Sequence, residues 1–160
     1  MKELKVEGTN KLALVDDVDY DRLSVYKWFN TGTSDHLIRT KTIRRRTHNF
    51  ILANEVMQTV NIRYDHIDRD GFNNQKSNLR PATRSQNGAN KDKQKDTTSV
   101  FKGVNWHKRD KVFQSRATIN GKLYHLGSFQ SEIDAAISYN IFAVKNFQEF
   151  ACLNKIPFTW

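Results

Sequence analysis

Hydrolytic chemistry is available to four polar residues of one short segment: Asp65, His66, Asn78 and Asn87. The histidine side chain has an unperturbed pKa of about 6.5, which suits a general base at neutral pH. A carboxylate and an amide oxygen form a hard-oxygen pair of the kind that Mg²⁺ or Mn²⁺ prefers. Hydrolysis of a phosphodiester needs an activated water, charge neutralisation on phosphoryl oxygens and a stabilised leaving oxygen. This set of residues offers groups for all three.

The same residues also have ordinary structural interpretations. An Asp-His pair is more often part of a surface turn than of a site, and the two asparagines alone would be a turn residue and a helix-surface residue. Neighbours on a regular strand point to opposite faces, so Asp65 and His66 share a site only if the strand ends or bulges there. The loop that begins at Asp68 favours such an end.

The chain is strongly basic, which favours a polyanionic partner. It has 160 residues, a formal net charge of +9 and a pI of about 9.7. This length is enough for one ordinary domain or two very small ones. The charge is concentrated in the middle of the chain, and residues 101–125 carry six basic and one acidic side chain. Charge alone leaves DNA, RNA and acidic membranes open as partners.

Cysteine usage and the apolar runs exclude several classes of protein. The one cysteine, Cys152, excludes an intramolecular disulfide and a multi-cysteine zinc site, so we expect no structural zinc. The N-terminal residues are charged and mixed, unlike a signal peptide. No apolar run has the length of a membrane span, so we expect no membrane contact and a cytoplasmic protein.

Local patterns in the first half predict the elements that would position the polar residues. Residues 1–30 read as a strand followed by a short helix or turn, and residues 37–46 as a basic strand with a solvated cationic face. Helical spacing predicts a helix near 50–59. Thr83 or Ser85 would cap a further helix that runs to about residue 90.

The pattern changes after a polar stretch, residues 88–99, which reads as a linker because it cannot bury a face. Asn120-Gly121 between two strand-like runs predicts a hairpin. Alternation in the preceding strand places Gln114, Arg116 and Thr118 on the face opposite Phe113, Ser115, Ala117 and Ile119. We therefore expect a three-stranded sheet with one polar face.

A helix should follow this sheet and cover its apolar face. Ser131 and Asp134 have the spacing of a capping box, which predicts a helix over 131–147. Its expected buried stripe is apolar at helical spacing and consists of Ile133, Ala136, Ile137, Ile141 and Val144.

The segment 64–87 resembles the HNH homing endonucleases of phages, whose core is a ββα-metal motif. The matching residues are Tyr64, Asp65, His66, Ile67, Asp68, Asp70, Gly71, Phe72, Asn73, Asn74, Ser77, Asn78, Leu79, Arg80, Ala82, Thr83, Ser85, Gln86 and Asn87. Asn78 follows His66 by 12 residues and Asn87 follows after 9 more, which is the spacing of that motif. Residues 13–20 and 26–28 also look like this family.

This resemblance implies a role for each residue. His66 would be the general base, and Asp65 and Asn87 would hold one divalent ion, Mg²⁺ or Mn²⁺. Asn78 would hydrogen-bond to the backbone of the long loop and keep His66 oriented. The chain departs from the family at Ala53, where members usually have a histidine, and His48 is out of register by five residues. The departure puts full activity in doubt.

Residues 99–154 resemble an AP2/ERF-type DNA-binding domain. The match includes Phe101, Lys102, Gly103, Val104, Trp106, Phe113, Gly121, Lys122, Leu126, Gly127, Phe129, Ala135, Ala136, Tyr139, Ala143, Phe150, Ala151, Leu153 and Asn154. A β-sheet can enter the major groove and read base edges with polar side chains. The expected DNA contacts here are Lys102, Asn105, His107, Lys108, Arg109, Gln114, Arg116, Thr118 and His125. Any one of them alone also fits a solvated face.

The basic strand before the motif adds expected phosphate contacts: Arg39, Lys41, Arg44, Arg45 and Arg46. Contacts of this kind supply affinity with steep salt dependence and little sequence information. A solvated sheet edge is the alternative interpretation of this strand.

Together these features predict an α+β protein with a nuclease module over 1–90, a basic linker over 91–99 and a DNA-binding module over 100–160. The expected function is metal-dependent cutting or nicking of double-stranded DNA by a monomer or weak dimer, encoded by a phage or mobile element in a bacterial host. A catalytically inactive, sequence-specific DNA-binding protein is the alternative. A basic RNA-binding protein is a weaker third possibility.

Overall fold

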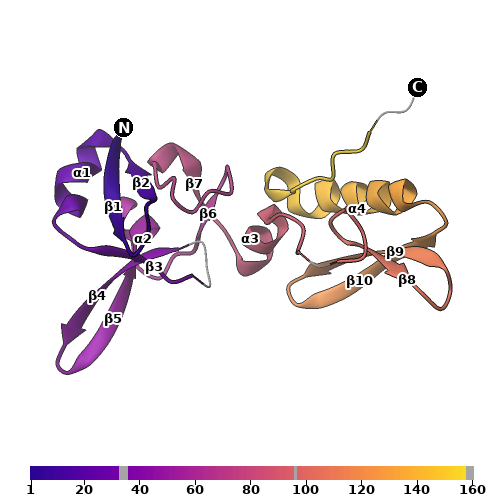
Figure 1. Ribbon diagram of the computed structural model, residues 1–160, viewed down its shortest axis with the longest axis horizontal. Coiled ribbons are helices and arrows are strands. Elements are labelled where there is room, and N and C mark those ends of the chain that lie inside the picture. Colours follow the sequence, from indigo (N-terminus) through magenta and orange to yellow (C-terminus); the bar gives the residue numbers. More distant parts are fainter. Residues whose placement is uncertain (33–35, 96, 158–160) are drawn as a thin grey trace. The chain divides into compact units, whose positions relative to one another are not determined.

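The computed structural model describes residues 1–32, 36–95 and 97–157, which form a mixed α+β structure (Figure 1). Within these residues there are three sheets and four α-helices. The chain divides into two compact units, Met1–Ala82 and Thr83–Trp160, and each is described here by itself. None of the helices in the described residues is both long and apolar enough to cross a membrane.

The first unit is built on a five-stranded sheet with the order β2-β1-β3-β4-β5. Its strands are β1 (Lys2–Glu7), β2 (Leu12–Val15), β3 (Trp28–Asn30), β4 (Leu37–Ile43) and β5 (Arg46–Ile51). The strands β1 and β3 are parallel and the other neighbours are antiparallel. Alternation buries Leu4 and Val6 of β1, so one face of this sheet is the core face.

Two short helices, α1 (Asp17–Ser24) and α2 (Leu52–Val56), complete the core of this unit. Leu23 of α1 and Leu52 of α2 are fully buried beside Trp28. The indole of Trp28 donates a hydrogen bond of 3.0 Å to the Leu23 carbonyl, so its one polar atom is satisfied. The expected helix over 50–59 is shorter than predicted, because residues up to Ile51 continue the β5 strand.

The predicted basic strand over 37–46 is in fact most of a hairpin. Arg44 and Arg45 both have positive φ values, 47° and 64°, and form the two-residue turn between β4 and β5. Such a turn ordinarily carries Asn-Gly, so two arginines left no recognisable turn signal in the sequence.

A second, two-stranded sheet carries the polar segment singled out above. Its strands, β6 (Tyr64–His66) and β7 (Leu79–Pro81), are antiparallel, and His66 pairs with Leu79. A long loop joins them and ends in a single 3-10 turn, η1 (Lys76–Asn78). The β6 strand ends at His66. The side chains of Asp65 and His66 are therefore not forced to opposite faces, as they would be in the middle of a regular strand.

Acidic residues around the start of α1 hold this loop against the first unit. Asp16 accepts hydrogen bonds from the Lys76 backbone at 2.9 Å and from the Gln75 side chain at 3.3 Å. Asp19 is buried and pairs with Lys76 at 2.8 Å and with Arg22 at 2.6 Å. Burial opposes ionisation of Asp19, but hydrogen bonds from Lys76 and Arg22 outweigh it and lower the pKa of this carboxyl.

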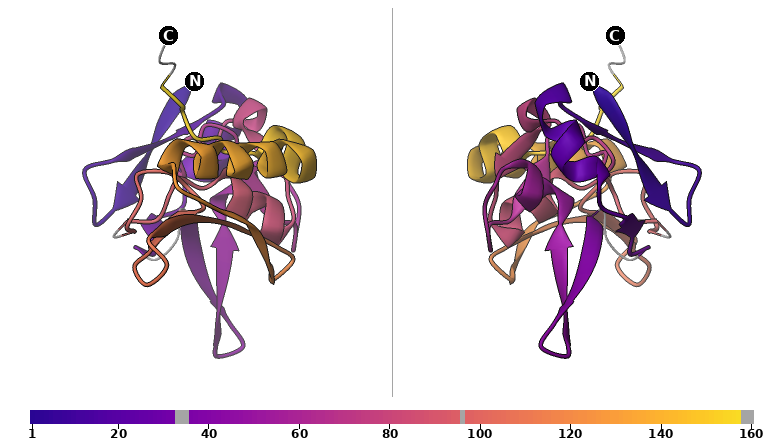
Figure 2. Two further views of the ribbon diagram at one scale, coloured as in Figure 1. Left: turned by 90° about the vertical axis from the view of Figure 1, so that its right-hand side faces the viewer. Right: turned by 90° about the vertical axis from the view of Figure 1, so that its left-hand side faces the viewer.

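The second unit contains a three-stranded antiparallel sheet backed by one long helix (Figure 2). Its elements are α3 (Arg84–Asn90), β8 (Val104–His107), β9 (Val112–Ile119), β10 (Lys122–Phe129), α4 (Glu132–Phe147) and the 3-10 turn η2 (Gln148–Phe150). Asn120 and Gly121 both have positive φ and connect β9 to β10, which confirms the predicted hairpin. Thr83 caps α3 in a full capping box with Gln86, and Ser131 caps α4.

The buried stripe of α4 differs from the prediction. Ala135, Ala136, Tyr139, Ala143 and Phe147 are buried, whereas three members of the expected stripe are exposed: Ile137 by 40%, Ile141 by 65% and Val144 by 53%. Small alanine side chains let the helix approach the sheet closely. The distance at which α4 packs, and not the hydrophobicity of its residues, therefore determines which face of the helix is buried. Of the predicted stripe, Ala136 is fully buried.

The described part of the predicted linker 91–99, which leaves out residue 96, packs within the second unit. Ser99 is buried and donates a 2.6 Å hydrogen bond to Glu132, and the Trp106 backbone donates to Thr98 at 2.8 Å. The helix α3 also belongs to this unit, since the Cys152 backbone donates to the Ala89 carbonyl. The two compact units divide between residues 82 and 83.

Gly103 offers a test of the close approach between β8 and α4. Its φ is +76°, and a Cβ there would lie 2.1 Å from a Tyr139 ring atom and 2.8 Å from the Arg116 carbonyl oxygen. Positive φ and overpacking together should make Gly103→Ala destabilising by about 2–4 kcal/mol in urea unfolding. The matched control is Gly88→Ala, in open space on α3, which should be neutral or stabilising by up to about 1 kcal/mol. Equal effects of both variants would contradict this packing.

Asp19→Asn tests the buried charge that holds the loop. Because the pKa of Asp19 is lowered on folding, its contribution to stability is complete above the unfolded value of about 3.9 and is lost as pH falls further. We expect a loss of about 1–3 kcal/mol at pH 7 that shrinks below pH ~4. Asp21→Asn, at an exposed site, is the control and should change stability by less than ~0.5 kcal/mol. A pH-independent gap between Asp19→Asn and the wild type would refute the electrostatic explanation.

Candidate functional site

Asn78 closes the loop between β6 and β7 by bonding to its backbone at two points. Its Oδ1 accepts a 3.0 Å hydrogen bond from the Asp68 amide, and its Nδ2 donates a 2.8 Å bond to the Asn73 carbonyl. Its own carbonyl accepts a 2.9 Å bond from the Ile67 amide. The side chain is buried, so water competes little for these bonds. The backbone on either side of the loop is thereby held to one asparagine.

Asp68 is the second organising residue of the loop. Its carboxylate accepts hydrogen bonds from the Asp70 amide at 2.9 Å, the Asn78 side chain at 2.8 Å and the Asn73 side chain at 2.7 Å. Burial opposes its ionisation, yet these bonds and the nearby His66 lower the pKa of Asp68 below its ordinary value. The carboxylate is therefore ionised at neutral pH and serves to order the loop.

His66 lies at the end of β6 with its Nε2 atom 3.2 Å from the Oδ1 atom of Asn74. The amide of Asn74 is oriented, because its Nδ2 donates a 3.0 Å bond to the Gly71 carbonyl. Its Oδ1 must then accept, so Nε2 of a neutral His66 carries the proton and Nδ1 carries the lone pair. The environment thus favours one tautomer of the histidine.

Asn74 was not among the residues that the sequence singled out for function. It is almost fully buried, at 1% exposure, and its backbone amide donates to the Leu14 carbonyl of β2 at 2.8 Å. The only signal was the pair Asn73-Asn74 in a polar loop, and nothing in that pattern tells which amide faces the histidine.

Asp65 precedes His66 on β6 and is buried beside the β7 strand. Both Nε and Nη2 of its cross-strand partner Arg80 contact the Oδ2 atom, at 2.9 and 2.8 Å. This charge-assisted contact fixes the orientation of the buried carboxylate. Its oxygens and the amide oxygen of an asparagine are hard donors, so the residue types fit a divalent ion such as Mg²⁺.

Asn87 lies on α3 and thus in the second compact unit. The geometry of the first unit therefore covers three of the four predicted residues: Asp65, His66 and Asn78. In the described residues, no group of three or more His, Cys, Asp and Glu side chains is placed as metal ligands. The pair Asp65 and Asn87 would not form such a group, because it contains only one carboxylate and one amide.

Ala53, where the resembling family usually has a histidine, belongs to the hydrophobic core. It lies on α2, is 3% exposed and packs in the same cluster as Leu52 and Val56. His48 is exposed on β5 and is not part of this cluster, so it does not replace the histidine that the family usually has at the position of Ala53.

The predicted polar face of the three-stranded sheet is present in the second unit. Cross-strand pairs place Asn105, Gln114 and Ser128 in one row and Arg116 beside His125 in the next. Ser115 and Ala117 of β9 are buried on the opposite face, towards α4. The alternation predicted for β9 is confirmed.

Five predicted DNA contacts of this unit are already engaged within it. Among them, the Arg116 guanidinium donates a hydrogen bond to the Gln114 side chain. The Lys102 ammonium donates to the backbone carbonyls of Ala89 and Lys91, and so ties α3 to the sheet. His107 and Arg109 both contact the carboxylate of Asp110, at 3.2 and 3.0 Å. Lys108 is exposed in the same turn, and Thr118 and His125 are exposed on their strands.

The basic residues of the first unit also divide into engaged and exposed ones. Arg39 pairs with Glu55 at 3.1 Å and stacks between the rings of Tyr26 and Phe50, at 4.1 and 4.2 Å. The four other expected phosphate contacts are exposed: Lys41, Arg44, Arg45 and Arg46.

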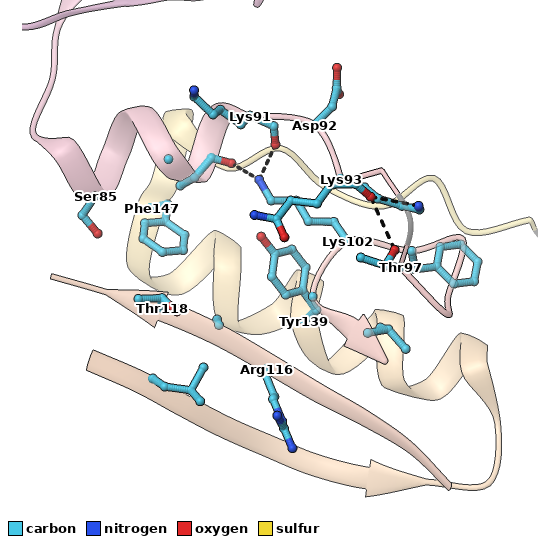
Figure 3. Close-up of a pocket in the computed structure, with 18 of the residues that line it drawn as sticks. Ser85, Lys91, Asp92, Lys93, Thr97, Lys102, Arg116, Thr118, Tyr139 and Phe147 are labelled. Atoms are coloured by element: carbon cyan, nitrogen blue, oxygen red, sulfur yellow. Dashed lines mark hydrogen bonds between the residues drawn. The ribbon is translucent and has the colours of Figure 1, made fainter. Parts of the chain in front are cut away.

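A hollow of about 1020 Å³ lies in the second unit between α3, the segment after it and the sheet (Figure 3). Its lining is cationic, with Arg84, Lys91, Lys93 and Arg116, and includes the phenol of Tyr139, whose pKa is raised by burial. None of the described residues in the lining is a histidine. The hollow therefore lacks the general base that the β6–β7 loop provides.

Comparison with known proteins bears on the whole chain. No family model and no solved structure matches it. It is 34% identical over 153 residues to an uncharacterised HNH endonuclease of Acanthamoeba polyphaga mimivirus, covering 94% of this chain and 79% of the relative. On this similarity, the chain belongs to the HNH endonuclease family.

Proposed function

We propose that this protein is a divalent-metal-dependent endonuclease of the homing type that hydrolyses phosphodiester bonds in double-stranded DNA. The observation that carries the proposal is the ordered β6–β7 loop, in which Asn74 presents His66 in one tautomer. A histidine held in one tautomer is suited to act as a general base. The net charge of +9 supports a polyanionic substrate.

In the proposed mechanism, His66 accepts a proton from a water molecule at Nδ1 while Nε2–H stays bonded to Asn74. The water oxygen attacks phosphorus in line with the 3′ oxygen. The new phosphorus–oxygen bond forms as the bond to the 3′ oxygen breaks, and that oxygen takes a proton from solvent. The products are a 5′-phosphate and a 3′-hydroxyl. Asn78 keeps the loop closed so that His66 stays positioned.

Asp65 and Asn87 would hold one Mg²⁺ or Mn²⁺ ion. When bound, such an ion neutralises charge on the phosphoryl oxygens and stabilises the leaving oxygen. Arg80 orients the Asp65 carboxylate. Asn87 lies on α3 in the other compact unit.

The second unit would grip the duplex in the manner of an AP2/ERF domain. Its polar sheet face presents Asn105, Gln114, Arg116, Thr118 and His125, types that hydrogen-bond to base edges or phosphates. Lys108 extends this surface at the β8–β9 turn. We propose a monomer or weak dimer that works in the cytoplasm of a bacterial host and is encoded by a phage or mobile element.

An inactive, sequence-specific DNA-binding protein is the second candidate, and Ala53 is the observation that favours it. The family position that usually carries a histidine is filled by a small core residue. If that histidine contributes to catalysis elsewhere in the family, this chain would retain the DNA-binding surfaces and lose cutting.

Cleavage of supercoiled plasmid separates the two candidates. With Mg²⁺ or Mn²⁺ we expect open-circle or linear product, and with EDTA none. His66→Ala should lower the rate by roughly 10²–10⁴-fold, the usual contribution of general base catalysis, while DNA binding persists. His36→Ala, a histidine outside the site, is the control. Metal-independent binding without any cleavage by the wild type would favour the inactive protein.

The role of Asn74 is testable through the pH dependence of cleavage. In Asn74→Asp a carboxylate faces His66 and stabilises the imidazolium, so the acidic limb of the pH–rate profile should move to higher pH. Activity at pH 7 should fall, with DNA affinity unchanged. Asn74→Ala removes the acceptor and should lower kcat roughly tenfold or more without that shift. An unshifted profile for Asn74→Asp, in a protein that circular dichroism shows to be folded, would reduce Asn74 to a structural role.

A further inference from the structure

The β4–β5 hairpin is uncovered on both faces beyond its base. Every residue from Thr40 to Asn49 is exposed, and in Figure 1 the hairpin extends away from the other strands of its unit. A two-stranded ribbon with no covered face buries little apolar area and is marginally stable alone. The distal hairpin therefore contributes little to the core. Packing does not constrain its residue types, so these can be suited to binding a partner.

The register of this hairpin separates its side chains into two chemically different faces. Lys41 pairs with His48 and Ile43 with Arg46, so the cations Lys41 and Arg46 share one face with an imidazole and one apolar side chain. Thr40 pairs with Asn49 and Thr42 with Thr47, so the other face carries only uncharged hydrogen-bonding groups. The two threonine hydroxyl oxygens lie 3.5 Å apart.

The tip concentrates positive charge at some conformational cost. Arg44 and Arg45 both adopt positive φ, which costs roughly 1 kcal/mol or more for each non-glycine residue. No aspartate or glutamate occurs between His36 and Asn54. A turn that keeps two arginines where Asn-Gly would relieve the strain indicates that the charge itself is used.

The base of the hairpin is fixed to the body of the first unit. Arg39 bonds to Glu55 of α2 at 3.1 Å and lies between the rings of Tyr26 and Phe50. These contacts hold the hairpin in one orientation before any partner binds. A pre-oriented arm loses less conformational entropy on binding than a flexible one.

We propose that this hairpin is a DNA-reading arm that enters the major groove of the duplex. Its tip and cationic face would contact phosphates, and Thr40, Thr42, Thr47 and Asn49 would face base edges. The proposal rests on the proposed function for the identity of the polyanion, and it adds sequence reading by a surface outside the polar sheet.

The dimensions and composition of the arm favour duplex DNA over other nucleic acids. A two-stranded ribbon fits the major groove of B-form DNA, which is about 12 Å wide. The major groove of A-form RNA is too deep and narrow for side chains to read. Single strands are usually held by stacking on aromatic rings, and residues 40–49 contain no Phe, Tyr or Trp.

The test uses the His66→Ala protein in EDTA, so that binding is measured without cleavage. The probe is a 30-base-pair duplex pool of random sequence, and its Kd is followed as a function of salt. Replacing the tip by Arg44→Asn and Arg45→Gly keeps a favourable turn and should reduce the slope of log Kd against log salt by about 2. The control removes two charges elsewhere in the unit, with Lys5→Gln and Lys27→Gln, and should leave the slope unchanged.

A second variant addresses reading by the uncharged face. Thr42→Val with Thr47→Val preserves shape and strand propensity but removes both hydroxyls. We expect an unchanged salt slope and a changed set of sequences enriched from the pool. An unaltered enriched set would overturn sequence reading by this face.

Other outcomes would overturn the arm itself. Equal slopes for the tip variant and the control would mean that the arginines do not contact phosphates. Stronger competition by an RNA hairpin or by single-stranded DNA than by duplex would make the partner a different nucleic acid. The assay measures binding without cleavage, so its result does not depend on whether the protein is a nuclease. The nuclease proposal and the arm proposal can therefore fail independently.

Discussion

The hydrogen bonds between Asn78 and the loop backbone are the constraint on which the rest of the site depends. A long connection between two three-residue strands has no ladder of its own, so its backbone groups must find partners elsewhere. The side-chain amide of Asn78 and the carboxylate of Asp68 are these partners, and each of them makes more than one hydrogen bond. Only with the loop closed do Asn74 and His66 meet.

The first unit in turn supports this loop through its acidic N-terminal segment. Leu14 of β2 bonds to the backbone at Phe72 and Asn74, and Asp16 receives the backbone amide of Lys76. Asp19 adds a buried charge that pairs with the Lys76 side chain. The five-stranded sheet thus serves as a rigid base, and the short sheet β6–β7 gains its order from contacts more than fifty residues away in the chain. Sites on such supported elements hold their geometry better than sites on free loops.

Much of the fold was predictable wherever the signal is local. Capping residues at Thr83 and Ser131 and the Asn120-Gly121 turn satisfy backbone groups within a few residues, so sequence alone reveals them. The hairpin at Arg44 and Arg45 was missed, because its turn lacks the usual residues. The face of α4 was missed because the closeness of the sheet, and not the apolar pattern, selects which residues are buried.

For the candidate site, residue types together with the resemblance to HNH homing endonucleases indicated Asp65, His66, Asn78 and Asn87, and with them a chemistry that the family membership supports. Residue types and their spacing are properties of the covalent chain, so they are the same in every conformation. Only the tertiary structure decided that Asn74 faces His66, because that contact depends on an amide oriented by Gly71 and β2. It likewise decided that Arg39 pairs with Glu55, whereas the other basic residues of the hairpin are exposed. Burial and hydrogen-bond partners are properties of the folded chain, and residue spacing does not contain them.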